Sequence, residues 1–156
     1  MSDDTLIIGI GNRYRGDDGL GCLIADQLKI AGVDAVAHDG EPASLIDLWQ
    51  GRGHVILVDA VSSRAPAGTI HYIDLHAQAL PERFRSYSTH AFGIAEAVEL
   101  ARVLGKLPQK IVFYGVEGKS FAADTELSAT LRQAAKTLQQ IILDDINKER
   151  TCMNIP

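Results

Sequence analysis

Three side chains of this sequence, Asp18, Asp59 and His90, have types and positions that could hold a divalent metal ion or perform acid–base chemistry. Asp18 lies in a glycine-punctuated loop after a short apolar run, and Asp59 directly follows the apolar residues Val55–Val58. His90 stands at the start of a predicted helix. One imidazole with two carboxylates suits a borderline metal such as Ni²⁺ or Zn²⁺. Three protein ligands would also leave coordination positions open for a substrate or for water.

Each of these residues also has a plainer interpretation. Asp59 could cap the turn that follows its strand, although a carboxylate at the end of a buried strand is costly to desolvate without compensation. His90 by itself would be a capping or surface histidine, and it gains interest only because two acidic loops could face it. The remaining histidines are weaker candidates: His38 beside Asp39, which could approach the site, and His54, His71 and His76, which lie along or next to strands.

Several other chemistries lack their sequence patterns. The spacing of Gly9, Gly11 and Gly16 misses the G-x-G-x-x-G dinucleotide pattern, and the Asp17-Asp18 pair would repel a pyrophosphate. There is no phosphate-binding G-x-x-x-x-G-K-[ST] sequence. The G-x-S-x-G elbow of serine hydrolases and the H-E-x-x-H helix of zinc proteases are absent as well. An acidic loop that receives a cation fits the residues better than an anion site.

The elements that must position these residues follow from hydrophobic periodicity and from the turn residues between the periodic segments. Apolar or alternating runs predict strands at Thr5–Ile10, Val33–Ala37, His54–Ala60, Thr69–Leu75 and Lys110–Val116. Amphipathic spacing predicts helices over Gly21–Ile30, from Pro42 to about Gly51, and over Ala91–Leu104 and Asp124–Ile146. Residues 77–89 show no regular pattern.

Strands that alternate with helices predict an α/β fold, a three-layer α/β/α sandwich on a mixed, mostly parallel twisted sheet of about five strands. The short link of residues 62–68 favours an antiparallel pairing of Thr69–Leu75 with His54–Ala60. We expect one domain over residues 1–156, with a loose tail after about residue 148. Ligands of such sheets bind beyond the carboxyl ends of the strands, where Asp18, Asp59 and His90 are expected to meet.

Composition excludes several classes of function. The chain has 156 residues, a net charge of −5 and no basic stripe, which disfavours nucleic-acid binding. Its apolar runs are too short to span a membrane, and its acidic N-terminus does not resemble a signal peptide. Cys22 and Cys152 form no Cys-x-x-Cys pattern. We therefore expect reduced, inert cysteines and a cytoplasmic protein.

The segment Gly9–Gly21 closely resembles the G-x-G-N-x-x-x-x-D-[DE]-G-x-G signature of the [NiFe] hydrogenase maturation protease family. Asp18 falls at the first metal-contacting carboxylate of that family, Asp59 is similar to the second, and His90 is similar to its histidine. The resemblance extends over roughly residues 5–145, with a phosphorylase/hydrolase-like fold. Two segments depart from the family pattern: Asp39-Gly40-Glu41-Pro42 replaces Asp-Gly-Gly-Thr, and Gly115-Val116-Glu117-Gly118 replaces Gly-Ile-Glu-Pro.

The resemblance implies an endopeptidase that removes the C-terminal extension of a nickel-loaded hydrogenase large-subunit precursor. The nickel belongs to that substrate, and Asp18, Asp59 and His90 would recognise it, with no tightly bound resident metal expected. The nickel could polarise the scissile carbonyl or activate a water molecule, or one aspartate could serve as general base. Two alternatives remain open: another metal-dependent hydrolase, and a metallochaperone or docking module that senses nickel without cutting.

Overall fold

The structure of the protein, a computed structural model, describes residues 4–85 and 89–153. Its strands form one sheet in the order β2-β1-β3-β5-β4. Neighbouring strands from β2 to β5 are parallel, and β4 pairs antiparallel with β5 at the edge. The strands are β1 (Thr5–Ile10), β2 (Ala35–His38), β3 (His54–Val61), β4 (Ile70–Asp74) and β5 (Lys110–Glu117).

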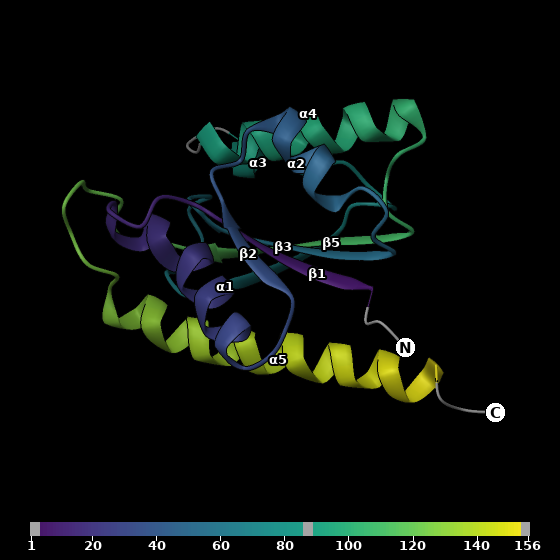
Figure 1. The fold of residues 1–156 in the computed structure, drawn as a ribbon. Helices are drawn as coiled ribbons and strands as arrows, with labels where there is room; N and C mark the ends of the chain where they lie inside the picture. Colours follow the sequence, from purple (N-terminus) through teal and green to yellow (C-terminus); the bar gives the residue numbers. More distant parts are fainter. Residues whose placement is uncertain (1–3, 86–88, 154–156) are drawn as a thin grey trace.

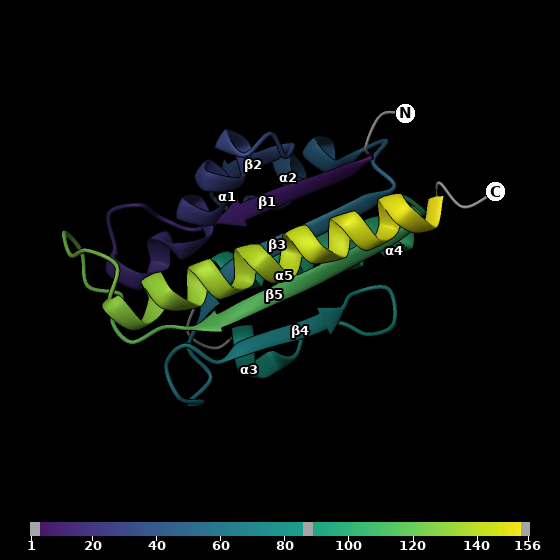
Figure 2. The same ribbon diagram turned by 90° about the horizontal axis from the view of Figure 1, so that it is seen from below.

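Helices cover both faces of this sheet (Figure 1). The helices α1 (Leu20–Ile30) and α5 (Ala129–Met153) pack on one face, and Figure 2 shows α5 lying along β3 and β5. The other face is covered by α2 (Pro42–Trp49), α3 (Glu82–Arg85) and α4 (Thr89–Leu104). A short 3₁₀ turn, η1 (Gly16–Gly19), precedes α1. The predicted three-layer sandwich on a mixed, mostly parallel sheet is therefore confirmed.

The central strand β3 is buried along its whole length, and its side chains alternate between the two cores. Val55 and Leu57 pack with the residues of α2, α3 and α4, whereas Ile56 and Val58 pack with those of α1 and α5. By the same alternation, Asp59 belongs to the face that α4 covers. The strand thus orients a carboxylate toward α4.

Helix α1 approaches the sheet at backbone contact distance through two glycines. A Cβ atom on Gly9 would lie 1.9 Å from the carbonyl oxygen of Gly21, and one on Gly21 would lie 2.4 Å from the carbonyl oxygen of Ile10. Only glycine leaves this space free, because every other residue carries a Cβ atom. These two positions of the Gly9–Gly21 segment hold the loop with Asp18 close against the strand ends.

The partner of β4 differs from the sequence prediction. The prediction paired residues 69–75 with β3, but β4 pairs with β5, from Ile70 opposite Val116 to Asp74 opposite Val112. β5 takes the place beside β3 because its apolar run, buried on both faces, needs neighbours on both sides. The link after β3 passes one strand, β5, and so spans two strand spacings, about 10 Å, to reach the edge (Figure 2).

The last helix begins and ends later than its sequence pattern predicts. Asp124 has a left-handed backbone with φ 59°, so it cannot lie inside a helix. The helix begins instead after Ser128, whose hydroxyl oxygen accepts the backbone N–H of Leu131 at 3.4 Å. It continues to Met153 and so includes residues 149–153, which the prediction assigned to the loose tail.

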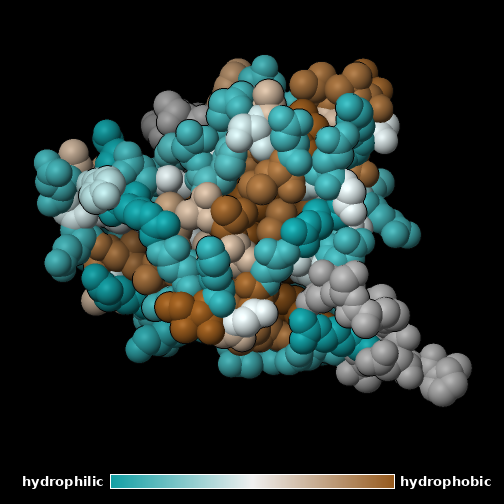
Figure 3. Space-filling model, in the orientation of Figure 1, coloured by the Kyte–Doolittle hydropathy of each residue, from teal (hydrophilic) through white to brown (hydrophobic). Residues whose placement is uncertain are grey.

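The outer face of α4 carries exposed apolar side chains near its C-terminal end, visible as a brown patch over that helix in Figure 3. They are Leu100, Val103 and Leu104, and they lie roughly 15–20 Å along the helix axis from His90. In the described part of the chain, no helix combines the length and the apolar character needed to cross a membrane.

Candidate active site

The three predicted residues lie at the carboxyl-end edge of the sheet, where β1 and β3 are neighbours. The chain leads from β1 to β2 on one side and from β2 to β3 on the other, so this edge contains a topological switch point, the usual ligand site of such sheets. Asp18 lies in η1 directly after β1, Asp59 lies in β3, and His90 lies in the first turn of α4.

Asp18 and His90 are in direct contact. The Nε2 atom of His90 lies 3.0 Å from Oδ2 of Asp18. The same carboxylate oxygen accepts the backbone N–H of Asn12 at 3.1 Å. Both side chains are largely buried, with exposed fractions of 19% for His90 and 9% for Asp18. The structure therefore joins two residues that are 72 positions apart in the sequence.

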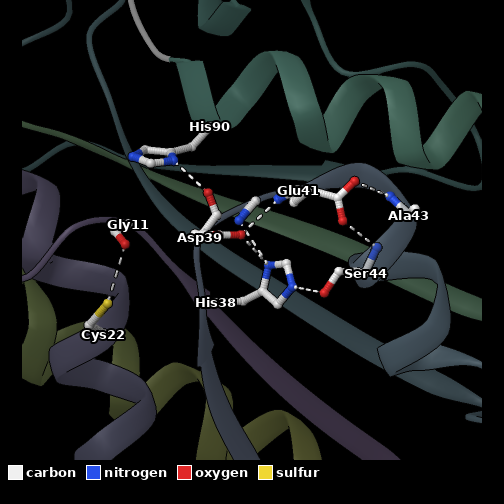
Figure 4. Close-up of polar contacts among 9 residues, drawn as sticks. Gly11, Cys22, His38, Asp39, Glu41, Ala43, Ser44 and His90 are labelled. Atoms are coloured by element: carbon white, nitrogen blue, oxygen red, sulfur yellow. Dashed lines mark hydrogen bonds and ion pairs between the residues drawn. The ribbon is translucent and has the colours of Figure 1, made fainter.

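The loop after β2 fixes the other side of the His90 ring. Nδ1 of His90 donates to the backbone carbonyl oxygen of Asp39 at 2.7 Å (Figure 4). Gly40 and Gly93 let this loop touch the first turn of α4, because a Cβ atom on Gly93 would lie 2.2 Å from the carbonyl oxygen of Gly40. The position of His90 thus depends on contacts that no local sequence pattern predicts.

These contacts hold His90 in its protonated form. The hydrogen bond to Asp18 raises the pKa of His90 to about 9, against the opposing effect of burial. The charges of Asp59 and Asp18 and the carbonyl of Asp39 contribute to this raised pKa of His90. Because a carbonyl and a carboxylate only accept, both ring nitrogens are donors and the ring is an imidazolium at neutral pH.

Asp59 is fully buried, with an exposed fraction of 0%. Among the described residues, neither of its carboxylate oxygens has a hydrogen-bond partner of good geometry. Burial raises the pKa of Asp59 well above 3.8, and the charge of Asp18 also raises it. The charge of His90 and the backbone N–H of Ala60 act in the opposite direction but do not outweigh burial. An unpartnered buried carboxylate is rare in a native fold and points to a functional site.

The three side chains do not form a metal cage in this conformation. Within residues 4–85 and 89–153, no three His, Cys, Asp or Glu side chains are grouped so that they could hold a metal ion. Nε2 of His90 and Oδ2 of Asp18 bind each other instead. A metal at this edge would have to replace that hydrogen bond and the proton in it.

Asp17, the neighbour of Asp18, has a structural role. Its carboxylate accepts the backbone N–H groups of Lys119 at 2.6 Å, Ser120 at 3.1 Å and Ser128 at 2.8 Å. Burial acts to raise the pKa of Asp17, but these hydrogen bonds outweigh burial and lower it. The charged carboxylate therefore ties η1 to the segment between β5 and α5.

His38 is likewise engaged locally rather than at the site. Its Nδ1 accepts the backbone N–H of Gly40 at 2.8 Å, and its Nε2 lies 2.8 Å from the hydroxyl of Ser44 (Figure 4). Both ring nitrogens are occupied, so His38 shapes the loop that carries Asp39.

One polar group at the same edge was not among the predicted site residues. Glu117, at the end of β5, is 1% exposed and binds His71 and Ser63. From the sequence, Glu117 was only part of a departure from the family pattern, and His71 was only a weak candidate. The sequence did contain a signal for this group, because Glu117 is a charged residue at the end of an otherwise apolar strand.

The chain is similar to known proteins over most of its length. Residues 30–145 match the hydrogenase maturation protease family. A putative hydrogenase maturation protease of Methanocaldococcus jannaschii is 31% identical over 159 residues, which cover 93% of this chain and 97% of the relative. The hydrogenase 2 maturation protease of Escherichia coli is 28% identical over 145 residues, covering 88% and 87%.

Solved structures give the same result for the fold. The hydrogenase maturating endopeptidase HybD of E. coli superposes with a TM-score of 0.81 at 22% identity, covering 93% of each chain. A [NiFe] hydrogenase maturation protease HycI from Thermococcus kodakarensis reaches a TM-score of 0.69 at 25% identity, covering 92% of each chain. The chain belongs to the hydrogenase maturation protease family. It is an endopeptidase, as the sequence analysis predicted.

Proposed function

We propose that this endopeptidase removes the C-terminal extension of a nickel-loaded [NiFe] hydrogenase large-subunit precursor in the cytoplasm. In this proposal Asp18, Asp59 and His90 recognise the nickel of the precursor. The observation that carries the proposal is the carboxylate of Asp59, fully buried and unpartnered among the described residues, on the sheet face that α4 covers. A divalent cation presented by a substrate would supply the missing partner.

The chemistry of the three side chains supports a cation rather than an anion. Two carboxylates and one imidazole match the ligands that borderline divalent metals accept. Docking requires a lone pair on Nε2 of His90, so the imidazolium must lose its proton as the metal arrives. Asp59 must likewise become ionised. Nickel binding would therefore release protons and replace the Asp18–His90 hydrogen bond with two coordination bonds.

The metal of the substrate would also assist the cleavage. A divalent ion next to the scissile carbonyl polarises it and lowers the barrier to attack by water. Specificity would then depend on the presence of the cofactor in the precursor and not on a peptide side chain alone. The protein part of the site supplies fixed ligands, because strand, turn and helix each hold one of them.

The test is processing of the precursor followed by measurement of its intact mass. The wild-type enzyme is expected to shorten the nickel-loaded precursor, which a mere docking module would leave intact. Asp18→Asn, Asp59→Asn and His90→Ala should each abolish processing, while circular dichroism reports a folded domain. Glu96→Gln, an exposed substitution on α4, serves as the control. Full activity in any of the three variants would remove that residue from the site.

A further inference from the structure

A second polar cluster, formed by Glu117, His71 and Ser63, lies at the same edge of the sheet. Oε1 of Glu117 lies 3.0 Å from Nε2 of His71, and Oε2 accepts the backbone N–H of Ser63 at 3.0 Å. The Ser63 hydroxyl also donates to Oε1. Because a carboxylate only accepts hydrogen bonds, this pairing places a proton on Nε2 of His71.

The cluster faces the same side as Asp59. Asp59 is paired with Gly115 in β5, and Gly115 is paired with His71 in β4, so the three residues form one row across the sheet. Residues of one row lie on the same face, and two strand spacings separate Asp59 and His71 by roughly 10 Å. The middle position carries no side chain, because a Cβ atom on Gly115 would lie 2.9 Å from the Phe113 ring.

Nδ1 of His71 takes no part in these contacts. The ring packs against Phe84 of α3 at a centroid distance of 4.8 Å, and the side chain is 17% exposed. No hydrogen bond to Nδ1 is formed by any of the residues 4–85 and 89–153. With a proton on Nε2, the neutral ring keeps a lone pair on Nδ1. That lone pair can accept a proton.

Peptide hydrolysis needs such a group. The attacking water must give up a proton, and the leaving nitrogen must gain one before the amine departs. This inference rests on the proposed function, in which Asp18, Asp59 and His90 use their lone pairs on nickel. Lone pairs that are bound to the metal are unavailable for proton transfer, which favours another residue at the edge as the proton carrier. His38 is unsuitable because both of its ring nitrogens are occupied.

We propose that His71 is the general base and general acid of the cleavage step, and that Glu117 is its positioning residue. Nδ1 of His71 takes a proton from water while the water oxygen bonds to the scissile carbonyl carbon. The same proton then passes from Nδ1 to the peptide nitrogen as the C–N bond breaks. One water is consumed, His71 returns to its neutral form, and Glu117 stabilises the transient imidazolium through Nε2.

Single-turnover cleavage of nickel-loaded precursor tests this role. His71→Gln should slow cleavage by about 100-fold or more, the usual contribution of a general base, while precursor affinity stays within about threefold. Added imidazole should restore part of the rate to His71→Ala, which a purely structural histidine would not allow. His76→Gln is the matched control, because His76 follows β4 at the opposite end of the strand and binds through its backbone.

Cleavage by His71→Gln within about threefold of the wild-type rate would overturn the proposal. If the variants fail to fold, ¹⁵N NMR of the wild-type histidines still decides the tautomer. A proton on Nδ1 of neutral His71 would contradict the base role. A wild-type enzyme that leaves nickel-loaded precursor intact would instead contradict the proposed function. The tautomer measurement would then still test, independently of cleavage, whether Nδ1 of His71 carries the lone pair.

Discussion

At His90, the atom that would bind a metal carries a proton. Nδ1 donates to the carbonyl of Asp39, and Nε2 donates to Asp18. Metal binding therefore competes with a proton that the site itself stabilises, and the pKa of His90 near 9 measures that competition. The same reasoning applies to Asp59, whose raised pKa favours a neutral side chain until a cation arrives.

The first residue-scale prediction concerns this histidine. NMR titration of the free wild-type enzyme should show a His90 pKa near 9, and Asp18→Asn should move it down toward the ordinary value of 6.5. A raised histidine pKa stabilises the folded state below pH 6.5 and loses that contribution as the pH rises through 9. The stability difference between wild type and Asp18→Asn should therefore shrink above pH 9. An unchanged His90 pKa in the variant would show that Asp18 does not hold the proton.

A second residue-scale prediction concerns the buried carboxylate of Asp59. A carboxyl group whose pKa is raised on folding costs stability increasingly as the pH rises above its unfolded value. Asp59→Asn should thus raise the free energy of unfolding by about 1 kcal/mol or more at pH 8 and by less at pH 5. Urea denaturation at both pH values measures this. A variant less stable than wild type at pH 8 would mean that the charge is compensated in the fold.

At the scale of elements, substitutions of the two neighbouring aspartates of η1 are predicted to differ in their effects on stability and on processing. Asp17 receives three backbone N–H groups, so Asp17→Asn should cost about 2–4 kcal/mol of stability, since hydrogen bonds to charged groups are each worth about 1.5–3 kcal/mol. The lowered pKa of Asp17 predicts that this contribution fades as the pH falls toward and below 4. Asp18→Asn should cost less stability than Asp17→Asn, through the lost pairing with His90, with this cost fading above pH 9, and it should abolish processing. Equal unfolding midpoints for both variants would contradict this division.

The contact between α4 and the loop after β2 gives a further prediction. A Cβ atom on Gly93 would lie 2.2 Å from the Gly40 carbonyl oxygen, so Gly93→Ala must push the first turn of α4 away. His90 would then leave the Asp39 carbonyl. Processing should fall at least tenfold, since displacements of about 1 Å cost catalysis that much or more. Glu96→Ala on the same helix is the control, and undiminished processing by Gly93→Ala would show that the loop does not position His90.

For the whole molecule, the sequence predicts the layers better than the connections between them. The apolar runs of β1, β3 and β5 and the periodicity of α1 and α4 have local causes, and the α/β/α sandwich follows from them. The edge position of β4 has no local cause, because the order of strands is set by which strand is most deeply buried. The start of α5 was misplaced because Asp124 has the composition of a first helical turn but a left-handed backbone.

The site likewise has features that the sequence predicts and features that depend on contacts between distant segments. Family membership and endopeptidase class follow from the Gly9–Gly21 segment and the order of the later residues, and both are confirmed. The contact of His90 with Asp18 joins η1 to α4 and could only be expected from topology. The roles of Asp18, Asp59 and His90 in reading nickel stay predictions. The cluster around Glu117 escaped notice because its members come from three separate segments.

The most direct test of the central claim compares nickel-loaded and nickel-free precursor. Both are incubated with the purified enzyme, the nickel-free sample with a chelator, and the intact mass of the precursor is followed over time. We expect cleavage of the nickel-loaded precursor alone, by an enzyme that itself contains no stoichiometric metal. Rapid cleavage of the nickel-free precursor in the chelator would contradict nickel recognition by Asp18, Asp59 and His90.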